Sequence, residues 1–76
     1  MKYITFNDHN GVPSMVTFSA NIPHSLVAEK LGLREARSAG FITLTHAGFF
    51  CHGHSESLGV ASLVKDSELA NSYFKQ

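Results

Sequence analysis

The strongest structural signal in the chain is FITLTHAGFFCHGH, residues 41–54. β-Branched and aromatic residues lie on both sides of Ala47-Gly48, which is typical of two strands joined by a tight turn. From Ser38 to Ser55 there is no acidic or basic residue when histidine is counted as neutral. Because such a segment would promote aggregation at a sheet edge, we expect it at the centre of a sheet.

A second strand pair is predicted near the N-terminus. The segments YITF (3–6) and SMVTF (14–18) flank a turn cluster that contains Asn-Gly, the strongest short hairpin signal. Pairing Ile4 with Phe18 places the apolar residues of both strands on one face. Pro13 cannot donate a ladder hydrogen bond, so this strand end is expected at an edge or in a loop.

Two short helices are predicted, one after each strand pair. Pro23 suits the first helical position, and Gly32 is expected just past the helix end, with Leu33 folding back on Ala28 as a Schellman contact. The second helix is predicted from residue 63 or 64 onward, where apolar pairs recur at i, i+4 spacing and acidic residues precede a lysine.

The element order is therefore ββαββα, which predicts a small α+β domain over residues 1–76. We expect a four-stranded, mainly antiparallel sheet with the two helices on one face. A length of 76 residues allows one globular domain, and a hydrophobic content of 43% suffices for a core. The predicted core consists of Ile4, Phe6, Val16, Phe18, Val27, Leu31, Ile42, Leu44, Leu69 and Tyr73.

The composition argues against several function classes. Six basic and six acidic side chains give a formal net charge of zero, whereas proteins that bind nucleic acids or anionic membranes normally carry a basic surplus. No apolar run approaches the roughly 20 residues that span a bilayer, and the N-terminus lacks the apolar stretch of a signal peptide. Cys51 is the only cysteine, so no intrachain disulfide can form. We expect a cytoplasmic protein with neither a membrane nor a nucleic acid as partner.

The densest chemical feature is a histidine group, His46, His52 and His54. His-x-His in an extended strand can supply two corners of a metal site, and zinc is the metal that this donor set favours. The hairpin register decides whether His46 joins them. A two-residue turn at Ala47-Gly48 places His46 on the face opposite His52, whereas a three-residue loop over 46–48 brings the three imidazoles to one face. Alternatively, these are ordinary polar residues on a half-exposed sheet face.

The sequence contains no assembled catalytic set, and we expect no enzymatic activity. The segment GHSES (53–57) matches only part of the Gly-x-Ser-x-Gly turn of hydrolases, and its serines are better explained by turn chemistry or capping. The apolar neighbours of Cys51 predict a buried, inert thiol. Neither of the glycine-rich fingerprints for nucleotide binding is present.

Two functional hypotheses follow from the sequence. The first is a non-enzymatic protein–protein interaction or accessory module that associates with itself, as a homodimer, or with another protein. In this hypothesis the uncovered sheet face presents Phe41 and Phe50 as its interface. The second is a metal-binding or pH-responsive protein that uses His46, His52 and His54. An accessory protein that occludes a larger partner fits the size equally well.

Overall fold

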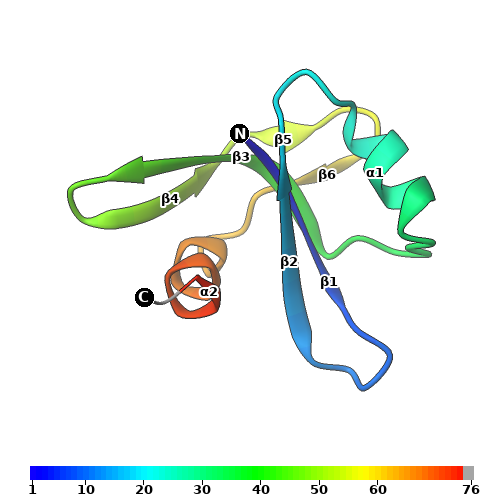
Figure 1. Ribbon diagram of the computed structural model, residues 1–76, viewed down its shortest axis with the longest axis horizontal. Helices are drawn as coiled ribbons and strands as arrows, with labels where there is room; N and C mark the ends of the chain where they lie inside the picture. Colours follow the sequence, from blue (N-terminus) through cyan, green and yellow to red (C-terminus); the bar gives the residue numbers. More distant parts are fainter. Residues whose placement is uncertain (75–76) are drawn as a thin grey trace.

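The computed structural model describes residues 1–74 (Figure 1). Over this range the chain forms, in order, β1 (Lys2–Asn7), β2 (Pro13–Phe18), α1 (His24–Lys30), β3 (Ser38–Thr45), β4 (Gly48–His52), β5 (His54–Ser55), β6 (Val60–Ala61) and α2 (Asp66–Tyr73).

The main sheet has four strands in the order β2-β1-β3-β4, and every neighbouring pair is antiparallel. This confirms the predicted small α+β domain with a four-stranded antiparallel sheet. Two short strands that the sequence analysis did not predict, β5 and β6, pair with each other between β4 and α2. Strand β3 lies inside the sheet as expected, whereas β4 is an edge strand.

The β1–β2 register is shifted by two residues from the predicted one. Ile4 lies opposite Val16 rather than Phe18. The reason is the turn: the backbone N–H of Asp8 donates to the Val12 carbonyl at 2.9 Å, and the Asp8 carboxylate accepts the Val12 N–H at 2.9 Å. These bonds close the loop tightly and extend the ladder toward it. Because a shift of two preserves alternation, the same side chains still share a face.

The β3–β4 register is neither of the two that the sequence analysis considered. Leu44 lies opposite Phe49 and Thr45 opposite Gly48, so the turn is His46-Ala47. The Thr45 hydroxyl fixes this turn by donating to the Gly48 carbonyl at 2.8 Å and accepting the Ala47 N–H at 3.2 Å. Gly48 has φ +111°, a conformation that side-chain-bearing residues rarely adopt.

The two helices pack on opposite faces of the sheet, which differs from the expectation of one shared face. Tyr3 and Ile4 are neighbours in β1, so their side chains point to opposite faces. Ile4 packs in a cluster with Ala28 of α1, and Tyr3 packs in another with Ala70 of α2. Figure 1 shows the two helices well apart. Helix α1 ends as predicted, with the Leu33 N–H donating to the Ala28 carbonyl at 2.9 Å.

The core agrees with the prediction only in part. Ile4 and Ile42 are buried, and Phe6, Val16, Phe18, Val27 and Leu69 pack partly buried against the core. Three predicted core residues are at least half exposed: Leu31, Leu44 and Tyr73. The remaining buried apolar positions are Tyr3, Met15, Ala28, Ala39, Cys51 and Ala70. Several of these residues are small, which allows the helices to approach the sheet closely.

A buried hydrogen-bond network joins α2 to β1. The Tyr3 hydroxyl donates to Oδ2 of Asp66, and the same oxygen accepts the Leu63 N–H at 2.9 Å. Tyr3 is fully buried and Asp66 is 4% exposed. Burial raises the pKa of the Tyr3 phenol, and the hydrogen bond to Asp66 raises it further. The network fixes the start of α2 against the sheet.

We expect Tyr3→Phe to lower the free energy of unfolding by about 1–3 kcal/mol, because a buried carboxylate loses one of its donors. Urea unfolding measures this loss. Tyr73→Phe is the matched control, since Tyr73 is half exposed and should change stability little. Equal losses in the two variants would contradict the assigned role of the network.

Helix α2 also covers the free edge of β4. Asn71 accepts the Phe49 N–H at 2.8 Å and donates to the Phe49 carbonyl at 3.0 Å, as a neighbouring strand would. The Ser67 hydroxyl accepts the Cys51 N–H at 2.9 Å. Because an open edge invites pairing with another chain, these side chains protect an uncharged strand from aggregation.

Replacing Asn71 by alanine is expected to expose this edge and produce oligomers larger than those of the wild type. Light scattering coupled to size exclusion detects them. Ser72→Ala, one residue further along the same helix and also exposed, is the control and should leave the particle size unchanged. If Asn71→Ala behaves as Ser72→Ala does, the edge is protected by something other than Asn71.

Candidate functional site

An exposed aromatic surface lies on the face of the β3–β4 hairpin that α2 does not cover. We call it the aromatic strip and define it as Phe41, His52 and Phe50. The imidazole of His52 stacks between the phenyl rings, with centroids 6.1 Å from Phe41 and 5.4 Å from Phe50. Interplanar angles of 24° and 16° keep the rings nearly parallel. Phe41 is 36% exposed and Phe50 53% exposed.

The hairpin register creates this stack. Phe41 lies directly opposite His52, and Thr43 lies opposite Phe50, so Phe50 is a diagonal neighbour of Phe41 across the ladder. The Thr43 hydroxyl lies 3.4 Å from Nε2 of His52 and helps to orient the imidazole. Side chains of the intervening residues, such as Ile42, point to the core on the other face.

The inner end of the strip contacts a buried histidine, His24, at the start of α1. Its ring meets Phe41 edge-on, with centroids 6.2 Å apart, and meets Phe18 in the same way at 5.4 Å. Nε2 of His24 bonds to the Gly40 carbonyl at 3.0 Å. His24 is 4% exposed. It therefore links the strip to the contact between α1 and the sheet.

Burial lowers the pKa of the His24 imidazole. The Gly40 carbonyl acts in the opposite direction because it favours the protonated ring, and the positive charge of Lys2 lowers the pKa further. His54 and Glu56 line a cavity of about 420 Å³ together with His24. Desolvation is the largest of these effects, so the pKa of His24 lies below that of an exposed histidine.

We expect acidification to destabilise the fold through His24. Its folded pKa lies below the unfolded value of about 6.5, so the unfolded state binds more protons as the pH falls past that value. The contribution of neutral His24 to the free energy of unfolding is fully present above the unfolded pKa. It is lost as the pH falls to the folded pKa. Urea unfolding from about pH 8 to about pH 5 measures the slope.

His24→Gln should remove this part of the slope, because the amide can still donate to the Gly40 carbonyl and does not titrate. His9→Gln, at an exposed position in the first turn, should keep it. An unchanged slope in His24→Gln would show that another group causes the pH dependence.

The structure does not bring the three proposed metal ligands together. His46 lies exposed in the turn, His52 belongs to the aromatic strip, and His54 lies in β5. Nε2 of His54 is 3.8 Å from a carboxylate oxygen of Glu56, and both side chains are exposed. Within residues 1–74, no three His, Cys, Asp or Glu side chains are grouped closely enough to hold a metal ion.

Two local features separate the histidines. The His46-Ala47 turn ends the ladder before His46 can share a face with His52. Gly53 has φ +79°, which breaks the extended backbone between His52 and His54. The alternation that makes His-x-His a ligand pair requires a continuous strand. The sequence analysis missed the stacking of His52 with Phe41 and Phe50.

The two nucleophilic side chains considered from the sequence are both buried. Ser55 is 2% exposed, and its hydroxyl accepts the Leu58 N–H at 3.2 Å, as turn chemistry predicted. Cys51 is buried, and desolvation, followed by the charge of Asp66, raises the pKa of its thiol to about 11. The predicted burial of Cys51 is therefore confirmed, and its lack of reactivity stays a prediction.

Comparison with known proteins gives no match: no family model, no curated protein and no solved structure matches the chain. Among the helices of residues 1–74, none has the length and apolar character needed to cross a membrane.

Proposed function

We propose that the protein is a non-enzymatic protein–protein interaction module that associates with itself through the aromatic strip. The observation that carries this proposal is the stack of Phe41, His52 and Phe50. It lies on the sheet face that α1 covers further in, and it is exposed because α1 does not reach the outer part of the β3–β4 hairpin. Exposed aromatic residues are enriched at interfaces, because they bury a large area at a low cost in conformational entropy.

The charge distribution favours a second copy as the partner. The surrounding segment, Ser38 to Ser55, contains no acidic or basic residue, and the chain has no formal net charge. Two copies therefore approach without electrostatic repulsion. An uncharged aromatic surface is complementary to itself, as a two-fold symmetric interface requires. A reducing compartment such as the cytoplasm suits this role, because the buried Cys51 then stays a thiol.

The size of the molecule limits the strength of the interaction. A standard interface buries about 800 Å² on each partner, which is roughly one sixth of the 5143 Å² accessible surface. The rings of the strip supply only the centre of such an area. The rim then comes from neighbouring polar residues such as Thr43 and Thr45, which are both exposed. We expect a weak, concentration-dependent dimer.

Phe50→Ser is expected to weaken self-association at least tenfold, because truncating an aromatic residue at an interface centre typically costs about 2 kcal/mol or more. Sedimentation velocity over a range of concentrations measures the shift toward monomer. Leu44→Ser is the matched control: Leu44 is 69% exposed, lies on the same hairpin and faces the opposite side.

The two variants separate a specific interface from general stickiness. If the aromatic strip is the interface, only Phe50→Ser dissociates the dimer. A strictly monomeric wild type, or equal effects of the two substitutions, would overturn the proposal.

A further inference from the structure

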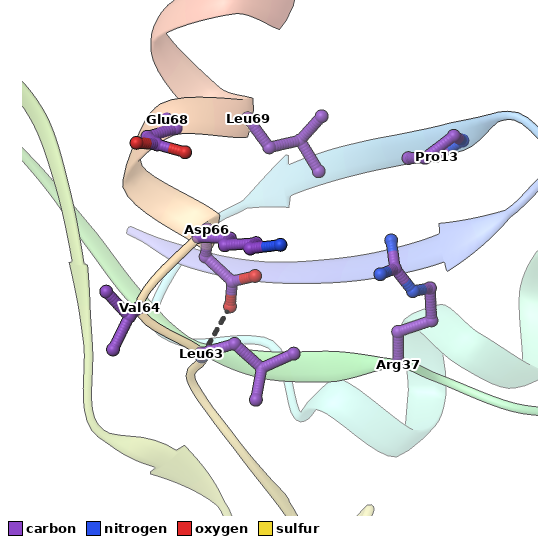
Figure 2. A pocket seen from close by; sticks show the side chains of 8 residues that line it. Pro13, Arg37, Leu63, Val64, Asp66, Glu68 and Leu69 are labelled. Carbon is purple, nitrogen blue, oxygen red and sulfur yellow. Dashed lines mark hydrogen bonds between the residues drawn. The ribbon is translucent and has the colours of Figure 1, made fainter.

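A cavity of about 550 Å³ opens at the start of α2, on a part of the surface separate from the aromatic strip (Figure 2). Its walls are mainly apolar and include Leu63, Leu69 and Pro13. Four charged residues line it as well: Arg37, Lys65, Asp66 and Glu68. Val64 at its margin is 96% exposed, and Leu63 is 48% exposed. Ligand cavities in proteins typically combine such apolar walls with a few well-placed polar groups.

The first polar group is a carboxylate oxygen of Asp66. The side chain is 4% exposed, and its Oδ2 accepts hydrogen bonds from Tyr3 and Leu63. Within residues 1–74, no hydrogen bond reaches Oδ1. Figure 2 shows one oxygen joined to Leu63 and the other directed into the space between Leu69 and Arg37. A nearly buried carboxylate thus presents a free acceptor to the cavity.

The second polar group is the guanidinium of Arg37, on the far side of the same space (Figure 2). In the described part of the chain it forms no ion pair with Asp66 or with Glu68, which also lines the cavity. The backbone N–H of Arg37 donates to the Thr5 carbonyl at 2.9 Å, which fixes the position from which the side chain extends.

We propose that this cavity binds a small zwitterion with an apolar body: a free apolar amino acid or a dipeptide. Its ammonium donates to Oδ1 of Asp66, its carboxylate accepts from Arg37, and its side chain packs against Leu63 and Leu69. A purely apolar molecule would cover the Asp66 carboxylate without giving it a donor, which is costly. A simple anion would leave Oδ1 of Asp66 without a donor, and a simple amine would leave the cations Arg37 and Lys65 without an acceptor from the ligand.

The test titrates the ¹⁵N-labelled full chain with L-leucine and, separately, with L-leucyl-L-leucine. We expect the backbone amide resonances of Leu63, Val64 and Leu69 to shift. The affinities of the two probes are compared, and the one that binds more tightly shows whether the ligand is an amino acid or a dipeptide. N-acetyl-leucine lacks the ammonium and leucinamide lacks the carboxylate, so each should bind at least about tenfold more weakly than leucine.

Arg37→Gln should weaken the binding of the tighter probe by at least about tenfold, because a charge-assisted hydrogen bond is lost. Arg34→Gln is the matched control: it removes the same charge from an arginine that lines a different cavity, and it should leave affinity unchanged. An absence of shifts with both zwitterions would overturn the proposal. Equal binding of the analogues, or an equal loss in Arg34→Gln, would overturn it too. None of these readouts depends on the oligomeric state.

Discussion

A carboxylate that is withdrawn from water must be hydrogen-bonded, and Asp66 meets this requirement across the sheet rather than within its own helix. Its bond to Tyr3 joins residues 63 positions apart and holds the start of α2 against β1. One turn further, Asn71 reaches the β4 edge because the helix start is already fixed. The position of α2 therefore decides which face and which edge of the β3–β4 hairpin are covered.

The covering of the sheet is asymmetric as a result. Helix α1 and the segment around β6 pack over Ile4 and Ala39 on one face, whereas α2 packs over Tyr3 and Ile42 on the other. The outer part of the hairpin is covered by α2 alone, so the aromatic residues on its second face stay exposed. The same helix that protects the strand edge from unspecific pairing thus leaves a defined, uncharged surface beside it.

Local signals located the four strands of the main sheet and the two helices, although not β5 and β6, because turn residues and helix ends are determined by nearby side chains. The hairpin signals and the Gly32 helix end were sufficient for this. The registers could not be predicted, since they depend on hydrogen bonds made by Asp8 and Thr45 once the turns close. The side that α2 occupies depends on a pairing too distant in sequence to leave a local pattern. For the same reason Arg37 and Asp66 were not recognised as neighbours of one cavity. Phe41 and Phe50 share a sheet face, but the prediction that both helices leave this face uncovered is wrong, because α1 packs on its inner part.

Two glycines, Gly40 and Gly53, approach the residues of the aromatic strip closely. A Cβ at Gly40 would lie 2.4 Å from the His52 carbonyl oxygen, and one at Gly53 would lie 3.1 Å from the Phe41 ring. Only glycine at these positions lets the chain leave β4 beside β3 and turn toward β5. Any larger residue at Gly40 would force the backbone at Gly40 or at His52 to shift. The geometry of the strip therefore depends on close backbone approaches at the point where the main sheet ends.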